Sequence, residues 1–400
     1  MTTSFLEVLS ETYTSTIGIG RSLADCQYVA SLFDSTCDSL DTPVDLTTHK
    51  GEEMSCTGQM MCPGGDGSQL YTESNPCTFT RKLCVTCETG SDNETYIRVQ
   101  SNQMPNHCFQ AINENPQTTG ISDFKVKFNR DVTGMMNVSE SDVDSSTKTE
   151  ELLCDIQRTA EANMMDGTGY TEYTNNGSAN PAPPGPPSQL TTASGIAVSG
   201  ANIFNALAAG NDDAVENEWI TLDQCLTHPT PTKEYHYHMW SPCAHKGNGW
   251  ANTSVAPDMC KDLAACHEDP IGFAVKKGWQ DSGSYGYGDI VGISRDGHMI
   301  YGPYKEDGTF WGCDDHDVCN GTFVEGNYVY VSTKEFPYIL GCFGPGPQQT
   351  YSVTCSNSSC PNNSLLDKPE KLEMEEESGA AALVSLASSI FAIAYSAILI

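Results

Sequence analysis

The sequence has few basic residues. Lys and Arg number 20 against 52 Asp and Glu, which gives a formal net charge of −32 over 400 residues. A surface of this charge repels polyanions, so we expect no nucleic-acid partner. The sequence also lacks a Gly-x-Ser-x-Gly elbow, a His-Glu-x-x-His helix, a P-loop and a dinucleotide fingerprint. The standard enzyme motifs therefore indicate no reaction.

Cysteine, by contrast, is abundant, with 18 residues. This number is typical of secreted proteins, in which disulfides persist, and is too high for a reducing cytosol unless the thiols bind metal. Structural zinc is disfavoured because Cys84-Val-Thr-Cys87 is the only Cys-x-x-Cys pair. We therefore expect disulfides, including two that close the short segments 260–266 and 313–319.

Seven Asn-x-Ser/Thr sequons support the same interpretation. Each is an acceptor for N-glycosylation, which takes place on solvent-facing turns of secreted chains. The expected glycosylation sites are Asn93, Asn137, Asn176, Asn252, Asn320, Asn357 and Asn362.

The carboxyl end has the layout of a GPI-anchor signal. A charged stretch at 368–377 is followed by the small residues Ser378, Gly379 and Ala380, a mildly polar spacer and an apolar run at 390–400. We expect attachment to the cell membrane through a lipid anchor at Ser378. The alternative is a tail anchor or spanning helix, but a spanning helix needs about 20 strongly apolar residues.

The amino end lacks the signal peptide that such an anchor requires. The first 22 residues contain no basic region and no long apolar run, and they include Glu7 and Glu11. Because a GPI signal acts only on chains in the secretory pathway, we expect the natural start to lie elsewhere.

Composition divides the chain into four parts. We expect a Cys-rich, loop-rich region at 1–94, with one or two short helices between Phe5 and Phe33. A β-rich domain is expected at 95–352, followed by an acidic stalk at 353–377 and the anchor signal at 378–400. Proline at 175–187 predicts an extended surface loop, because proline has no backbone donor.

Several short runs with strand composition or period-two alternation lie in the β-rich part. Expected strands are Tyr96–Val99, Phe124–Phe128, Gly195–Ile203, Tyr235–Trp240, Ile290–Ser294, Met299–Tyr304, Tyr328–Ser332 and Tyr338–Cys342.

The run Tyr235-His236-Tyr237-His238 lies on one of these expected strands. Successive side chains of a strand point to opposite faces, so His236 and His238 would project together, with Tyr235 and Tyr237 on the other face. Two such imidazoles can share one zinc, copper or iron ion, while the tyrosines support the strand. The structural alternative is a pair of histidines that only hydrogen-bond to the fold.

Asp296 opens a second local pattern, Asp296-Gly297-His298-Met299-Ile300-Tyr301. Asp-Gly before a short strand predicts a tight hairpin turn. The Asp296 carboxylate could support a metal-bound histidine, or it could accept hydrogen bonds from its own turn.

Four blocks, in order, resemble the signature of the YHYH-domain proteins. They are Ser101-Asn102-Gln103-Met104-Pro105-Asn106-His107, Gly195-Ile196-Ala197-Val198-Ser199-Gly200, the Tyr235 to His238 run, and Asp296 to Tyr304. Together they cover about two thirds of the chain, from Thr95 to Tyr351. The resemblance implies a secreted or surface β-rich domain, with the proline-rich loop as an insertion within it. It also implies that His107 belongs to the same site as His236 and His238.

The sequence thus predicts a mainly β protein, with a disulfide-rich, β-sandwich-like YHYH domain behind a small Cys-rich region. We expect it on the extracellular face of the plasma membrane, binding a transition metal (Cu, Zn or Fe) through His236, His238 and His107, with Asp296 in support. One alternative is a metal-dependent surface enzyme of unknown substrate. Another is a structural or adhesive coat protein without metal.

Overall fold

The structure is a computed structural model. It describes residues 17–59, 61–63, 70–110, 121–132, 174–175, 193–206, 208, 214–230, 234–244, 254–277, 286–312, 314–317, 319–341 and 343–344. All of them belong to one compact unit, Met1–Asn362. The proposed stalk and anchor signal, and the proline-rich segment after Asn175, lie outside the described residues.

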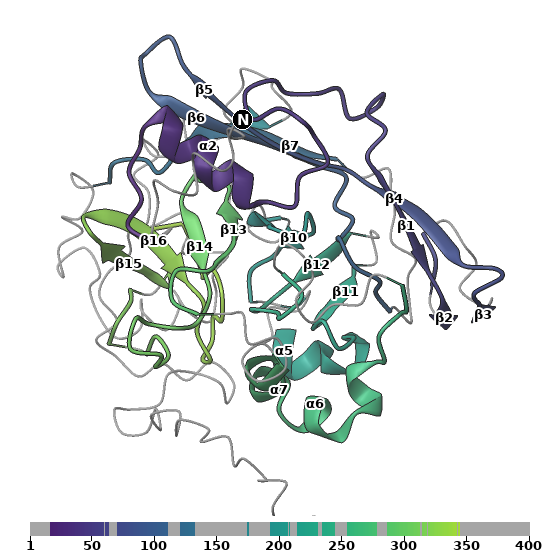
Figure 1. The fold of residues 1–400 in the computed structure, drawn as a ribbon. Coiled ribbons are helices and arrows are strands. Elements are labelled where there is room, and N and C mark those ends of the chain that lie inside the picture. The colour runs from purple at the N-terminus through teal and green to yellow at the C-terminus, as the bar shows by residue number, and fades with distance from the viewer. Residues whose placement is uncertain are drawn as a thin grey trace, which may run out of the picture. The chain divides into compact units, whose positions relative to one another are not determined.

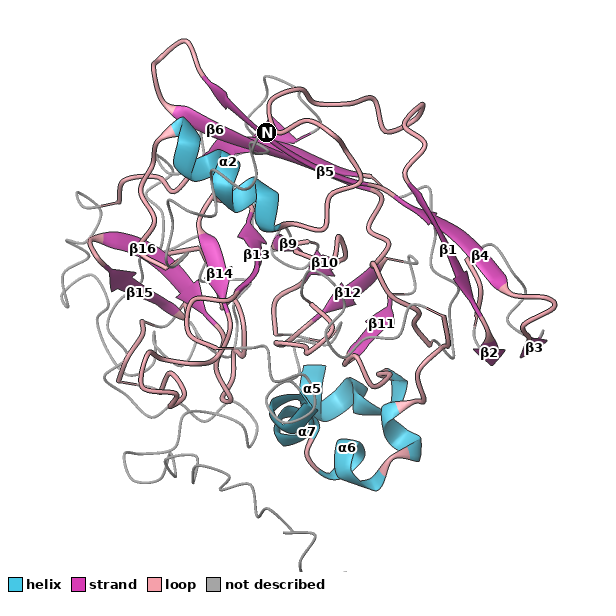
Figure 2. Cartoon of the chain, in the orientation of Figure 1, coloured by secondary structure: helices cyan, strands magenta, loops and turns pink. Residues whose placement is uncertain are grey.

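The largest element is an eight-stranded mixed sheet (Figures 1 and 2). Two neighbouring pairs, β10 with β12 and β14 with β16, are parallel, and the others are antiparallel. Its strands, in spatial order, are β11 (Thr227–Pro229), β12 (Tyr235–Tyr237), β10 (Asn202–Ile203), β9 (Gly195–Ala197), β13 (Ile290–Ser294), β14 (Met299–Tyr301), β16 (Asn327–Val331) and β15 (Gly321–Val324).

A four-stranded antiparallel sheet is formed by β5 (Leu83–Thr89), β6 (Thr95–Ser101), β7 (Ser122–Lys127) and β8 (Thr174–Asn175). Two small ribbons precede it in the chain. One pairs β1 (Glu52–Cys56) with β4 (Cys77–Arg81), and the other pairs β2 (Gly58–Gln59) with β3 (Leu70–Tyr71).

Apolar side chains of the two larger sheets share one core. In β6, Ile97 and Val99 are buried whereas Tyr96 and Arg98 are half-buried, so one face of this sheet is apolar. That face packs with Ile293 and other residues of the large sheet in a common cluster. A second apolar cluster covers the opposite face of the large sheet. Burial on both faces explains why β13, β14 and β16 are buried along their whole length.

The helices are short. α2 (Leu23–Leu32) begins at a capping box of Ser22 and Asp25 and packs against β5 and β6 (Figure 1). Four further short helices, α5 (Ala214–Glu218), η3 (Trp219–Thr221), η5 (Cys260–Asp262) and α6 (Ala264–Glu268), come before α7 (Pro270–Lys276). Among the described residues, no helix has the length and apolar character that crossing a membrane requires.

Disulfides connect these elements, as the cysteine content predicts. The bridge from Cys26 to Cys87 ties α2 to β5 across 61 residues, and closing a loop of that length stabilises a fold by roughly 4 kcal/mol in the chain-entropy model. No described cysteine is free. The pairs are Cys26–Cys87, Cys37–Cys84, Cys56–Cys108, Cys62–Cys77, Cys225–Cys243 and Cys260–Cys266.

Most strand predictions agree with the structure, and three segments differ. The segment 195–203, expected to be one strand, forms the antiparallel pair β9 and β10 with a turn between them. The segment 51–87, expected to be loop-rich, contains β1, β4 and most of β5; in β4 and β5, Thr, Val and Phe lie between the cysteines and suit strands. β5 then pairs with β6 across the boundary expected at residue 94. The segment 338–341 forms no strand, since Tyr338 has a positive φ of 61°.

Candidate metal site

Three histidines meet at the β11–β12 edge of the large sheet. His228 on β11 lies directly opposite His236 on the antiparallel strand β12, so both point to the same face. His238 lies one residue past the end of β12 and points to the same side as His236, since their Nε2 atoms are 2.8 Å apart. The three ligand nitrogens lie within 4.8 Å of one another. We refer to His228, His236 and His238 as the three-histidine cluster.

Each ring of the cluster is held by a hydrogen bond at Nδ1. The His236 and His238 Nδ1 atoms lie 2.9 Å from the Glu234 carbonyl oxygen and 2.6 Å from that of Asn205. A carbonyl only accepts, so both Nδ1 atoms carry the proton and donate it. In a neutral imidazole this leaves Nε2 with a free lone pair, the arrangement that metal-ligating histidines use.

Thr221 fixes His228 in the same tautomer. The Thr221 hydroxyl donates to the Glu218 carbonyl oxygen at 2.7 Å, which commits its only proton. It must therefore accept from His228 Nδ1, 2.8 Å away. His228 Nε2 is buried and has no hydrogen-bond partner within the described part of the chain. In their neutral forms, all three rings thus present a lone pair at Nε2.

These lone pairs converge. The Nε2 atoms of His236 and His238 are 2.8 Å apart, a distance at which two lone pairs repel unless a proton or a metal ion lies between them. Glu218 completes the group from the end of α5, with Oε2 3.3 Å from His228 Nε2 and 3.3 Å from His238 Nε2. Glu218 therefore lies beside two of the three converging histidine nitrogens.

Burial favours the neutral form of His228 and His236. Loss of solvation lowers the pKa of His228, and the Glu218 carboxylate offsets this lowering only in part. Loss of solvation also lowers the pKa of His236 strongly, and the neighbouring His238 and His228 lower it further. Burial raises the pKa of Glu218, but protonated His228 and His238 lower it by more, and a bound cation beside neutral rings would act in the same direction. Neutral imidazoles and an ionised carboxylate are the forms that bind metal.

The Phe204 ring covers one side of the three-histidine cluster. Phe204 stacks on His236 with ring centroids 4.0 Å apart and an interplanar angle of 25°, and it meets His238 edge-on at 6.0 Å. The histidine side chains are nearly buried, at 8% exposure for His228 and 5% for His238, whereas Glu218 is 25% exposed. Solvent therefore reaches this group from the side of Glu218.

The donor set fits a transition metal. A tetrahedral zinc ion with bonds of about 2.0 to 2.1 Å has ligand atoms about 3.3 Å apart. The two contacts of Glu218 already have that length, and His236 and His238 would separate by roughly 0.5 Å to match it.

The structure places His107 on the other face of β12, away from the cluster. His107 Nε2 lies 3.1 Å from the Tyr237 hydroxyl, and Nδ1 lies 2.9 Å from the Cys108 carbonyl oxygen. The Tyr237 hydroxyl also lies 3.1 Å from Ser199 Oγ. His107 thus corrects the ligand set expected from the sequence, because the alternation that joins His236 to His238 puts Tyr237, and hence His107, behind the sheet.

Tyr235 and Tyr237 point away from the histidines, as predicted. The Tyr235 hydroxyl bonds to Thr227 and lies 3.5 Å from Asp223 Oδ2. Asp223 is fully buried, and burial raises its pKa to about 7 against hydrogen bonds that lower it. Both tyrosines belong to the core cluster on that face. They hold β12 in place.

Asp296 supports its own hairpin and Tyr330. Its carboxylate accepts from the Ser294 hydroxyl, from the His298 backbone N–H at 3.3 Å and from the Tyr330 hydroxyl at 2.6 Å. Gly297, with a φ of 93°, completes the predicted β13–β14 turn. Of the two roles open for Asp296, its contacts match the turn.

Two of the predicted glycosylation sites lie on described residues. Asn93 is exposed in the turn between β5 and β6, where a glycan has space. Asn320 is fully buried, and its Nδ2, the glycan acceptor, donates to Thr333 Oγ1 at 2.9 Å. The folded protein therefore has no room for a glycan at Asn320. Asn137, Asn176, Asn252, Asn357 and Asn362, and the anchor residue Ser378, lie outside the described residues.

Two members of the site, His228 and Glu218, were not predicted from the sequence. His228 could have been found, because Pro229 and Tyr235 flank a short connection whose hairpin pairing sets His228 opposite His236. Glu218 gave no signal, since it is one of 52 acidic residues and reaches the site from a different element.

The fold and the cluster define a class of molecule: a disulfide-linked, mainly β protein whose large sheet carries three buried imidazoles beside a carboxylate. Residues 178–344 match the family model described as YHYH protein. This match confirms the resemblance found in the sequence and spans β9 to β16 with the whole cluster, whereas the Ser101–His107 block precedes it. Comparisons with curated proteins and with solved structures give no match.

Proposed function

We propose that the protein is a GPI-anchored extracellular glycoprotein that binds one transition metal ion through His228, His236, His238 and Glu218. The observation that carries the metal-binding proposal is the convergence of Nε2 lone pairs, with His236 and His238 2.8 Å apart. Two backbone carbonyls and the Thr221 hydroxyl accept hydrogen bonds from the three Nδ1 atoms and so fix the tautomers. The site is therefore organised before an ion binds. Imidazole nitrogen with one carboxylate suits zinc, copper or iron.

Elemental analysis of protein expressed through a secretory pathway tests the metal site. We expect one metal ion per chain in the wild type and none in a His236→Ala/His238→Ala variant. His107→Gln is the matched control, because His107 is equally buried but lies on the other face of β12. Loss of metal from His107→Gln, or its retention after both strand histidines are removed, would contradict this ligand set.

The extracellular location is supported by the disulfides, which are typical of secreted proteins. The anchor is supported by the sequence from Ser378 to Ile400. Treating intact cells with a phospholipase specific for phosphatidylinositol anchors should release the protein into the medium. Protein that stays with the cells would favour a spanning tail.

A second function, a metal-dependent enzyme, is favoured by one observation. Glu218 is the most exposed donor, so a water or substrate could take its place on the ion. In that case Glu218→Gln would retain the metal but change the exchange of metal-bound water, which relaxation measurements with a paramagnetic ion would detect. An ion with no exchangeable water in wild type and variant would exclude the enzyme.

A further inference from the structure

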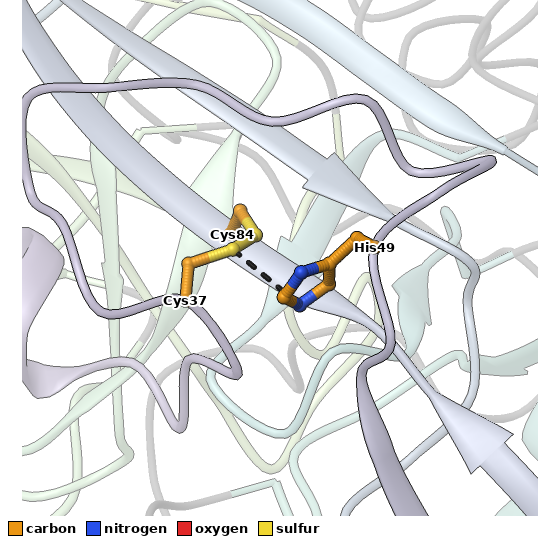
Figure 3. Close-up of side chains that lie close together, drawn as sticks. All are labelled: Cys37, His49 and Cys84. Carbon is orange, nitrogen blue, oxygen red and sulfur yellow. Dashed lines mark hydrogen bonds between the residues drawn. A yellow bond between two sulfur atoms is a disulfide. The ribbon is translucent and has the colours of Figure 1, made fainter.

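A second group of metal-binding atoms involves Cys37, His49 and Cys84. Their ligand atoms all lie within 4.8 Å of one another. Cys37 and Cys84 form a disulfide, and His49 Nε2 lies 3.6 Å from Cys37 Sγ (Figure 3). This group is separate from the three-histidine cluster, because the two share no residue.

This disulfide is the most accessible of those described. Cys37 is half-buried, whereas every other cysteine in the six described bridges is buried. Reduction begins when a thiolate reaches one sulfur of a bridge, so accessible bridges are the labile ones. A dithiol in solution would therefore reduce the Cys37–Cys84 bridge first, through Cys37.

A similar group elsewhere shows what a purely structural arrangement looks like. His107 lies beside the Cys225–Cys243 bridge, with Nδ1 3.7 Å from Cys225 Sγ. That group is buried throughout, and His107 uses both ring nitrogens for other hydrogen bonds. The Cys37–Cys84 bridge differs in two ways. Cys37 is half-buried, and the hydrogen-bond partner of His49 Nε2 is the hydroxyl of Thr36.

The chain holds His49 in place independently of the disulfide. The Asp45 carbonyl oxygen accepts from the His49 backbone N–H at 2.9 Å, and Lys82 Nζ ties the same turn at Leu46. His49 Nε2 lies 3.0 Å from the Thr36 hydroxyl, which also lies 3.1 Å from the Leu83 carbonyl oxygen. The Thr36 hydroxyl donates to that carbonyl and therefore accepts from His49 Nε2–H, so Nε2 binds an ion once the ring proton moves to Nδ1. Cys84 is fixed by strand β5.

We propose that Cys37, His49 and Cys84 form a redox-gated site for a thiophilic divalent ion of the zinc class. The disulfide closes the site, and reduction by a dithiol opens it. The two thiolates and the imidazole then supply three ligands, with a fourth position for water. Two sulfurs and one nitrogen select softer ions than the three imidazoles and carboxylate of the first site.

The opening step is a thiol–disulfide exchange. A thiolate of the dithiol attacks Cys37 Sγ, the bond between Cys37 and Cys84 breaks, and its electron pair passes to Cys84 Sγ, which takes a proton. The second thiol of the reductant attacks the mixed disulfide, releases Cys37 as a thiol and leaves the reductant as a cyclic disulfide. Two electrons pass from reductant to protein. Binding of the ion then releases the two thiol protons.

The first test follows the order of reduction in the full-length protein. Dithiothreitol is raised in steps, free thiols are trapped by alkylation, and modified cysteines are mapped by mass spectrometry. We expect Cys37 and Cys84 to be modified at lower reductant concentration than the other described cysteines. Reduction of another described bridge before this one would overturn the proposal.

The second test measures zinc bound by the selectively reduced protein. We expect one zinc ion more per chain than in the oxidised protein, together with slower alkylation of Cys37 and Cys84. Zinc at the three-histidine cluster is the same in both states, so it cancels from the difference. Reduced protein that binds no additional zinc would overturn the site even if the first test succeeds.

Two variants assign the ligands. His49→Ala should still be reduced first at Cys37–Cys84, but it should bind the additional zinc at least about tenfold more weakly, a loss of roughly 1.4 kcal/mol. Cys37→Ser/Cys84→Ser should bind no additional zinc under either condition. Unchanged zinc affinity in His49→Ala would exclude His49 and overturn the three-ligand site.

Discussion

The two faces of β12 carry the same kinds of side chain in opposite situations. Behind the strand, both nitrogens of His107 are hydrogen-bonded, to Cys108 and Tyr237. In front of it, His236 and His238 each donate from Nδ1 to a backbone carbonyl, and their Nε2 atoms face one another 2.8 Å apart. A polar face whose hydrogen bonds are all formed stabilises a fold, whereas a face on which nitrogen lone pairs converge is suited to a cation.

The largest expected difference between the faces is in their response to metal. A ligand that binds only the folded protein raises its free energy of unfolding by about 2.7 kcal/mol at a free concentration 100 times Kd. We expect His107→Gln to keep this increase and His228→Ala to lose most of it. Urea unfolding with and without metal measures both. An equal increase in the two variants would place the ion elsewhere.

The metal-free protein should show the reverse order. His107→Gln should lower the free energy of unfolding by about 2 kcal/mol, because it disrupts buried hydrogen bonds on the satisfied face. His236→Gln should cost less than about 1 kcal/mol, since a glutamine amide can donate to the lone pair of His238 Nε2. Urea unfolding in the presence of a chelator gives both values. A larger loss for His236→Gln would mean that the front face also stabilises the fold.

A smaller effect is expected in the pH dependence of stability, and it comes from His107, behind β12. Burial lowers the pKa of His107 from 6.5 to about 4, against the hydrogen bond that His107 donates to the Cys108 carbonyl, which raises it. Between these values the unfolded chain binds a proton that the folded protein does not, so His107 makes stability fall as pH falls from about 6.5 to 4. The slope is at most about 1.4 kcal/mol per pH unit.

Comparison with His107→Gln isolates this slope from that of other groups. The stability deficit of the variant relative to the wild type should shrink as the pH falls from 6.5 to 4, because only the wild type loses the contribution of His107. Urea unfolding at several pH values, with chelator present, measures the deficit. A deficit that stays constant would show that His107 is not held neutral by the fold.

The sequence predicted the common face of His236 and His238 but not the position of His107. Strand alternation alone gave the common face of His236 and His238 and the opposite face of Tyr235 and Tyr237, because it is a local property of an extended backbone. The position of His107 depends on a fold that brings residues 130 positions apart into contact. No spacing rule reports which face of β12 such a residue will reach.

The same distinction applies to the fold. Short alternating runs such as 96–99 and 290–294 were predictable, since their period is written in consecutive residues. The strands at 52–56 and 77–81 were missed because cysteine and glycine density suggested loops, while their pairing, which includes Cys56 opposite Cys77, depends on contacts distant in sequence. Glu218 was unpredictable for the same reason, as α5 delivers it from outside the sheet.

Tyr237→Phe should give the smallest effect and the most direct separation of the two faces. The change removes only the hydroxyl that links His107 Nε2 to Ser199 Oγ, each 3.1 Å away, and keeps the ring in the core. We expect a loss of about 1 kcal/mol in the free energy of unfolding, the net value of a typical buried hydrogen bond. Because the hydroxyl lies behind β12, metal stoichiometry and affinity should equal those of the wild type in a titration followed by calorimetry. A change in metal affinity without a change in stability would show that Tyr237 acts on the histidines through the strand, and the two faces would then have to be treated as one site.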